Sequence, residues 1–201
     1  MLRLLLTTLL LALPATAGTP AIETVAPPAK HPADCWELTF ESGYLWRVGA
    51  NSPIDYEIAP TQFTLRSPTV WTWWEDENGA RLVVRHRISL LLESIVEGPE
   101  DYYFGLSGAP SIEYWFPSEK TSLFLSVGGG IGWTNSTNIP GGQGQDFTLN
   151  WFAQFGVRQS FNENMSLLLA TYYLHHSNGG QTNPNPGIDA FGLTAGVGWK
   201  F

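Results

Sequence analysis

The chain has 201 residues, enough for one domain, and its 18 acidic against 10 basic side chains give a net charge of −8 at pH 7. This acidic balance excludes a nucleic-acid partner that needs a basic surface. The single cysteine, Cys35, excludes an intramolecular disulfide and a thiolate metal cluster. Aromatic residues make up 13% of the chain and charged residues only 14%, which favours contact with lipid through strands.

The amino terminus has the parts of a secretory signal peptide. Arg3 precedes a short apolar run, and a tripeptide of small residues ends at Ala17. The apolar run is too short to span a bilayer as a helix, so we expect a signal peptide over residues 1–17, cleaved after Ala17. Residues 18–34 are rich in Pro and Ala and show no periodicity, which predicts a flexible periplasmic leader.

From residue 36 onward, apolar side chains alternate with polar or small ones, which is the period of a β-strand. The clearest segment is 147–158, in which every odd position is apolar. The pattern predicts a single domain over residues 35–201 that contains eight strands. They are expected near residues 36–48, 62–75, 81–96, 102–116, 121–134, 146–161, 165–177 and 190–201.

A soluble β-sandwich also alternates, but three features favour an outer-membrane barrel. The strands are near the length that a tilted spanning strand needs, and aromatic residues gather at strand ends, as at Trp133 and Trp199. The face opposite the apolar one is crowded with glycine and with charged residues that can pair inside a narrow lumen. These charged residues are Arg85, Arg87, Glu113 and Arg158. The predicted fold class is therefore all-β, an eight-stranded antiparallel transmembrane β-barrel.

The predicted connections alternate in length, as expected for short periplasmic turns and longer outer loops. The short ones lie near residues 76–79, 117–120 and 162–164, and the longer ones near residues 49–61, 135–145 and 178–188. Two prolines, Pro60 and Pro68, conflict with the second strand, because proline cannot donate to a ladder.

The carboxy-terminal hairpin, residues 165–201, contains residues suited to acyl transfer. His175 and Ser177 are two apart on a strand, so both point to one face with their Cα atoms roughly 6.5–7 Å apart. Their parity is that of the lipid-facing residues, and Asp189 has the lipid-facing parity on the next strand. Ser177 could attack an ester, His175 could carry its proton, and Asp189 could fix the imidazole. Donors for an oxyanion are available from Asn178, Gly179, Gly180 and Asn185.

The same residues are also compatible with a wetted strand end that has no catalytic role, followed by an ordinary turn. His176 points to the lumen by parity and is expected to have a minor role. His86 faces lipid, with no second metal ligand in sight.

The hairpin resembles the signature of the PagL family of lipid A 3-O-deacylases. The resemblance covers about fifteen residues, from His175-His176-Ser177-Asn178 through the Asn-Pro-Asn-Pro-Gly turn to Asp189, twelve positions after Ser177. It implies an eight-stranded barrel that hydrolyses the 3-O-linked acyl chain of lipid A on its outer wall, without metal or cofactor. It assigns His175 as base, Ser177 as nucleophile and Asp189 as acid member, with Asn185 and the Gly180 backbone at the oxyanion.

Two residues depart from the family signature, which usually has Glu in place of Asp189 and Ala in place of Gly179. The shorter carboxylate puts its reach to His175 in doubt. Two other functions stay open: a non-catalytic barrel that binds surface ligands through its outer loops, and another lipid acyl hydrolase or transferase with the same triad. Partners implied are lipid A or lipopolysaccharide and outer-membrane lipid, and a homodimer is left open.

Overall fold

The computed structural model describes residues 30–49 and 55–201. In this part of the chain there is one short 3-10 helix, η1 (Pro32–Asp34), and there are nine strands. The strands are β1 (Glu37–Arg47), β2 (Glu57–Arg66), β3 (Trp71–Glu75), β4 (Arg81–Glu97), β5 (Tyr102–Trp115), β6 (Thr121–Thr134), β7 (Phe147–Ser160), β8 (Met165–Ser177) and β9 (Ile188–Lys200). None of the described helices has the length and apolar character needed to cross a membrane.

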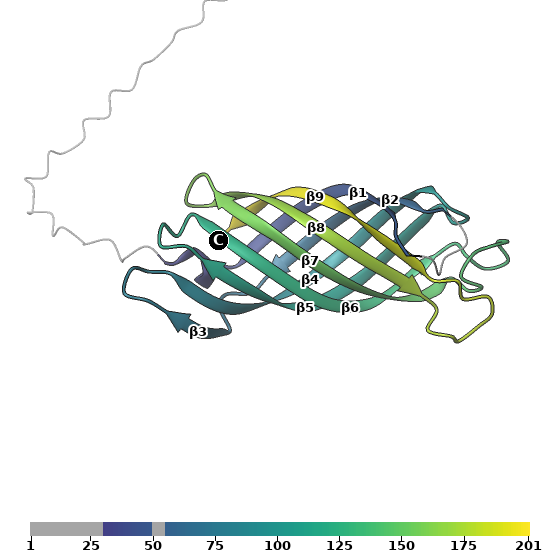
Figure 1. Cartoon of the computed structure of the whole chain (residues 1–201), viewed down its shortest axis with the longest axis horizontal. Helices are drawn as coiled ribbons and strands as arrows, with labels where there is room; N and C mark the ends of the chain where they lie inside the picture. Colours follow the sequence, from purple (N-terminus) through teal and green to yellow (C-terminus); the bar gives the residue numbers. More distant parts are fainter. Residues whose placement is uncertain (1–29, 50–54) are drawn as a thin grey trace, which may run out of the picture.

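Eight of the strands close into an antiparallel barrel, which confirms the predicted fold class. Hydrogen-bonded neighbours follow the order β2-β1-β9-β8-β7-β6-β5-β4, and β2 pairs with β4 to complete the ring. The short β3 adds to the edge of β4. Figure 1 shows the strands running obliquely around one long axis, as closure of a sheet into a barrel requires.

The predicted strand over residues 62–75 is wrong, because this segment belongs to two strands. β2 ends at Arg66, and the strand pattern breaks before β3 begins. Pro68 lies in this break, where its missing N–H weakens no ladder. Pro60 is accommodated inside β2: it pairs with Glu93 of β4, and the β1–β2 ladder has no partner at its position.

The two ends of the barrel differ in their connections. One end, here called the turn end, has the short turns between β3 and β4, between β5 and β6 and between β7 and β8, together with the carboxy terminus (Figure 1). The other, here called the loop end, has the longer β1–β2, β6–β7 and β8–β9 connections. The connections predicted to be short and those predicted to be long therefore lie at opposite ends of the barrel. The loop end also has one short connection, residues 98–101, between β4 and β5.

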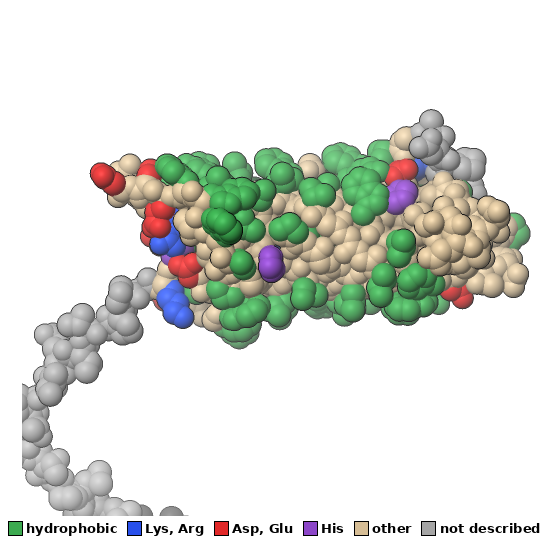
Figure 2. Space-filling view, turned by 90° about the horizontal axis from the view of Figure 1, so that it is seen from below, with side chains coloured by type: hydrophobic (Ala, Val, Ile, Leu, Met, Phe, Trp, Pro, Cys, Tyr) green, Lys and Arg blue, Asp and Glu red, His purple; other side chains and the backbone are tan. Residues whose placement is uncertain are grey.

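The outer wall of the barrel is apolar along its length. Leu167 and Leu169 of β8 and Leu193 of β9 are each more than half exposed, whereas the residues directly before and after each of them in the strand are buried. Figure 2 shows hydrophobic side chains spread over the wall, with acidic and basic side chains gathered near the two ends. Such a surface is stable when lipid rather than water surrounds it, as in transmembrane barrels.

The lumen is filled with paired polar side chains. The carboxylate of Glu113 lies 2.9 Å from Arg158 Nη1 and 3.3 Å from Arg85 Nη1, with all three side chains fully buried. Arg87 donates to Gln154 rather than to a carboxylate. Three of the four charged residues predicted to pair inside the barrel thus form one network. Buried charges need such partners, since an unpaired one is costly to desolvate.

A regular element, η1, precedes the predicted domain boundary at residue 35. η1 covers residues 32–34, within the predicted flexible leader, and Ala33 is fully buried against Val83 and Trp115 at the turn end. The side chain of His31 caps η1 by accepting a hydrogen bond from Ala33 N at 3.1 Å. The predicted signal peptide, residues 1–17, lies outside the described residues.

Candidate active site

Three polar side chains lie on the lipid-facing wall near the loop end, where β7, β8 and β9 run side by side. The ladder places His175 of β8 directly opposite Asp189 of β9 and opposite Trp151 of β7. Ser177 is the last residue of β8, two positions beyond His175, so both side chains leave the same face of the sheet. The strand parity from the sequence therefore holds for all three residues.

His175 and Asp189 are in direct contact. His175 Nδ1 lies 2.8 Å from Asp189 Oδ1, and the two side chains are 25% and 18% exposed. A carboxylate can only accept, so Nδ1 carries the hydrogen in this pair and Nε2 is left as the basic nitrogen. This is the tautomer that a general base beside a serine requires.

Ser177 is half-buried at the end of β8, and its hydroxyl has no hydrogen-bond partner among the described residues. The structure thus joins two of the three predicted catalytic residues and places the third beside them, unbonded. Nucleophile-to-base hydrogen bonds are often formed only when substrate is bound, so an unbonded serine is compatible with a nucleophilic role.

Two aromatic residues that the sequence analysis did not single out complete this part of the wall. The hydroxyl of Tyr173 donates to Asp189 Oδ1, the same oxygen that binds His175. The ring of Trp151 lies 4.9 Å from the ring of Tyr173 and 5.9 Å from that of His175, measured between centroids. Parity could have identified Tyr173, because it precedes His175 by two residues and long side chains reach diagonal partners across a ladder.

The loop after β8 is organised around the buried side chain of Asn178. Its Nδ2 donates to backbone and side-chain oxygens of the surrounding loops: Gln143 O at 2.6 Å, Thr182 O at 2.9 Å, Thr182 Oγ1 at 3.0 Å and Pro184 O at 3.1 Å. Its Oδ1 accepts from Gly180 N at 2.8 Å, and its backbone N donates to Asn185 Oδ1 at 2.9 Å.

These contacts distinguish three of the four predicted oxyanion donors, Asn178, Gly180 and Asn185. The amide of Asn178 and the N–H of Gly180 are both engaged inside the loop. Asn185 is exposed, and its Nδ2 has no partner among the described residues. Its side chain is therefore the one of the three with a donor still available for substrate.

Gln143, in the β6–β7 loop, ties this loop to its neighbours. Its backbone O accepts from Asn178, and its side-chain Oε1 accepts from Gly187 N at 3.3 Å. Its backbone N donates to Glu100 at 3.0 Å. Gly187 adjoins the catalytic candidates: it has a φ of +69°, and a Cβ there would lie 3.4 Å from His175 Cε1.

The sequence profile of the family described as lipid A 3-O-deacylase (PagL) matches residues 45–198, more than half of the chain. The chain belongs to this family. Members of the PagL family are carboxylic ester hydrolases, and the family and the closed barrel together place the protein in the bacterial outer membrane. No curated protein matches the sequence.

A solved structure is similar to this PagL-family chain: the "crystal structure of the outer membrane enzyme PagL". The TM-score is 0.52 at 18% sequence identity, and the match covers 80% of this chain and 97% of that chain. At this identity the likeness shows a shared fold. It agrees with the eight-stranded barrel derived above.

The other two described strand histidines lie apart from this cluster. His176 points into the lumen, as its parity predicted, where its Nε2 lies 2.8 Å from Glu93 Oε2 and its ring lies 3.9 Å from that of Tyr103. His86 is exposed on the wall at β4, as predicted. No group of three or more His, Cys, Asp or Glu side chains suited to a metal ion occurs in the described part of the chain.

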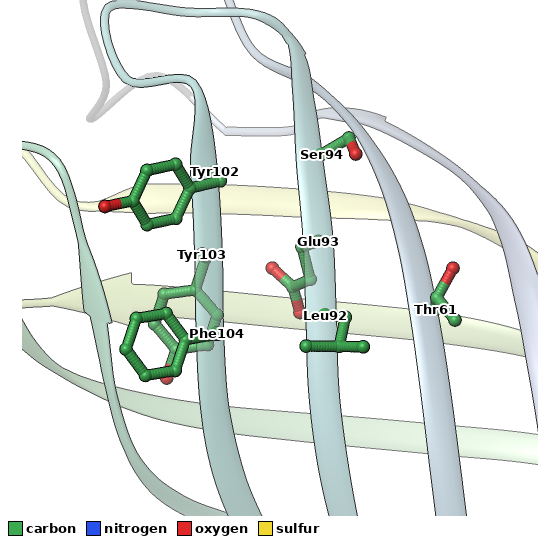
Figure 3. Close-up of a pocket in the computed structure, with 7 residues that line it drawn as sticks. All are labelled: Thr61, Leu92, Glu93, Ser94, Tyr102, Tyr103 and Phe104. Atoms are coloured by element: carbon green, nitrogen blue, oxygen red, sulfur yellow. The ribbon is translucent and has the colours of Figure 1, made fainter.

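Shallow hollows mark the wall on two sides of the barrel. One of about 290 Å³ lies over β2, β4 and β5, across the ring from β8, and Figure 3 shows its seven lining residues on those three strands. A second of about 290 Å³ is almost wholly apolar and lies over β7, β8 and β9, the strands of the candidate site. Its lining includes Leu167, Leu169 and Ala195, toward the turn end.

Proposed function

We propose that this protein removes the 3-O-linked acyl chain of lipid A by hydrolysis, with Ser177 as nucleophile, His175 as general base and Asp189 as its carboxylate partner. One observation carries the proposal: an imidazole–carboxylate pair lies on a membrane-facing wall, beside a serine of the same face. Ionisable groups are costly on a lipid-facing surface and persist there when they serve a function. Membership of the PagL family supplies the substrate class.

In the first step of the proposed reaction, Ser177 Oγ attacks the ester carbonyl while His175 Nε2 takes its proton. The tetrahedral intermediate collapses as His175 returns the proton to the sugar oxygen, which leaves as an alcohol. Water then attacks the acyl-enzyme with the same base, releasing a free fatty acid and restoring Ser177. Asp189 holds the imidazole orientation and stabilises its charged form in both steps.

The oxyanion is best served by the side-chain Nδ2 of Asn185. This donor has no described partner, while its Oδ1 is fixed by Asn178 N at 2.9 Å, so the amide is oriented before substrate binds. A preoriented donor stabilises developing charge without reorganisation. Asn178 and Gly180, also predicted at the oxyanion, act through the shape of the loop that they hold.

The position on the wall suits a lipid substrate. The sugar headgroup reaches the site from the loop end, and the acyl chains stay alongside the apolar surface of β7, β8 and β9. The substrate therefore needs no transfer of its chains into water, which would cost about 0.8 kcal/mol for each CH₂.

The test measures lipid A and free fatty acid by mass spectrometry after incubation with the purified, membrane-inserted protein. Wild type should release one acyl chain as the free acid, and Ser177→Ala and His175→Ala should each lower the rate about a thousandfold or more. His86→Ala is the matched control, an exposed histidine on the same wall that should leave the rate unchanged. An acyl chain that appears on another lipid would indicate a transferase, and intact lipid A would refute the proposal.

We also infer that residues 1–17 are removed during export. The mature protein should then begin at Gly18, which amino-terminal sequencing of protein from outer membranes measures directly. A chain that still begins at Met1 would contradict the inference.

A further inference from the structure

The Tyr173 hydroxyl has no part in the reaction proposed above, although it touches one of the proposed catalytic residues. It donates to Asp189 Oδ1, the oxygen that also binds His175 Nδ1 at 2.8 Å. Tyr173 is half-buried on β8, and its ring faces the lipid side like that of Trp151. No other hydrogen bond to the carboxylate of Asp189 occurs among the described residues.

A carboxylate in this position needs donors. Asp189 lies on the apolar outer wall of the barrel, where an ionised group with unsatisfied oxygens is destabilised. His175 supplies one N–H, but its imidazole gains and loses a proton during the proposed reaction. A second donor that is not part of the proton transfer fixes the carboxylate independently of the state of the imidazole.

The surroundings of Tyr173 hold its ring in place for this role. Its neighbours across the two ladders are Ala153 of β7 and Phe191 of β9, so there is a small side chain on one side and an aromatic one on the other. The Trp151 ring packs against it with an interplanar angle of 40°. A phenol is suited to this wall, because its ring is apolar and its hydroxyl can satisfy a partner.

We propose that Tyr173 is a positioning residue of the active site, which fixes the carboxylate of Asp189 so that its Oδ1 selects the Nδ1–H form of His175. This inference rests on the proposed function for its effect on the rate. Its structural claim, that the Tyr173 hydroxyl sets the tautomer of His175 by fixing the Asp189 carboxylate, does not depend on any activity.

The first measurement is the nitrogen NMR spectrum of the protein labelled at histidine, in micelles or nanodiscs. In wild type, His175 should show a single tautomer with hydrogen on Nδ1. Tyr173→Phe keeps the ring and removes only the hydroxyl, and it should shift His175 toward a mixture of tautomers. Tyr172→Phe is the matched control: the adjacent tyrosine faces the lumen, and its hydroxyl has no partner in the described structure. Identical His175 signals in wild type and Tyr173→Phe would overturn the inference.

The second measurement is kinetic. Tyr173→Phe should lower kcat about tenfold with KM unchanged, because a hydrogen bond to a charged group is lost and no substrate contact is removed. In an Asp189→Ala background the same substitution should have no further effect, since the hydroxyl has already lost its one hydrogen-bond partner among the described residues. An additional tenfold loss in that background would instead assign Tyr173 a direct contact with substrate and overturn the positioning role. If the wild-type protein removes no acyl chain from lipid A, the proposed function is refuted. The NMR measurement would still decide whether Tyr173 positions Asp189 and His175.

Discussion

Replacement of Asn178 by Ala should loosen the loop of the candidate active site and leave the barrel intact. The side chain is fully buried between the β8–β9 and β6–β7 loops. It has two N–H donors and one oxygen, and all three are used. With a net contribution of about 1 kcal/mol for each hydrogen bond, their loss favours loop opening by about 3 kcal/mol, which is roughly a hundredfold in the opening equilibrium.

Hydrogen exchange measures this directly. Amides of residues 178–187 should exchange about a hundredfold faster in Asn178→Ala, while amides of the barrel strands keep their protection. The rate of lipid A deacylation should fall with the loop: Ala keeps the backbone N–H that donates to Asn185 Oδ1, but an opened loop no longer holds this N–H and the Asn185 amide together. Asn135→Ala is the matched control: this asparagine of the β6–β7 loop binds Asp101 in the β4–β5 connection and has no hydrogen bond to residues 178–187 in the described structure.

Two results would refute the reasoning. If Asn178→Ala leaves the exchange of the loop unchanged, the buried amide does not hold the loop together. If the loop keeps its protection while kcat falls, Asn178 contacts the oxyanion itself, as the sequence alone suggested. Asn178→Asp refines the distinction, since it keeps the oxygen that accepts from Gly180 and replaces the donor amide with a second acceptor.

Three further predictions concern the barrel and the loops. Glu113→Ala should lower the free energy of unfolding by about 3 kcal/mol in urea titrations, because two buried arginines lose one of the two carboxylates that they share; an unchanged midpoint would show that Glu37, the other one, is enough for both. Gly187→Ala should destabilise the β8–β9 loop by about 1–2 kcal/mol because its φ is positive, and it should slow deacylation because the strained residue contacts His175; wild-type rates would show that the loop accommodates the Cβ without moving the ring. Hydrogen bonds from Thr137 and its neighbour hold the pKa of Asp146 below its ordinary value. The ionised carboxylate therefore orders the β6–β7 loop at neutral pH, and this order is lost as the pH falls through the lowered pKa. Exchange of that loop should become faster on acidification in wild type and stay insensitive to pH in Asp146→Asn.

The alternation of side chains was enough to predict the barrel because the wall and the lumen impose opposite demands on successive residues. It was also enough to place His175 and Ser177 together, since parity is a property of one strand. It failed at residues 62–75, where a proline break and a register shift between Thr72 and Trp74 interrupt the period. Periodicity identifies a strand only while its ladder is regular.

The role of Asn178 could not be predicted in full, because one of its partners comes from a distant segment. The shortest of its contacts joins it to Gln143, 35 residues away in the sequence. Nothing in the hairpin indicates that this amide is used inside the loop while that of Asn185 is left available. Tyr173 was missed for a different reason: its parity allows the diagonal contact to Asp189, but on a wall rich in aromatic residues it suggests lipid contact equally well, and the coordinates decide for the hydrogen bond.

Hydrogen bonds in the lumen fix the register of β8, and this register decides which side chains of the candidate site face the lipid. A slip of β8 by one residue would turn His176 to the lipid and bury His175. It would also break the lumen hydrogen bond from Ser166 of β8 to Glu37, 3.0 Å long and fully buried, and leave that glutamate with one fewer donor. The buried polar network therefore fixes the strand register from inside, and the same register presents His175 and Asp189 outside. The proposed reaction on the lipid-facing wall therefore depends on hydrogen bonds inside the lumen, such as that between Ser166 and Glu37.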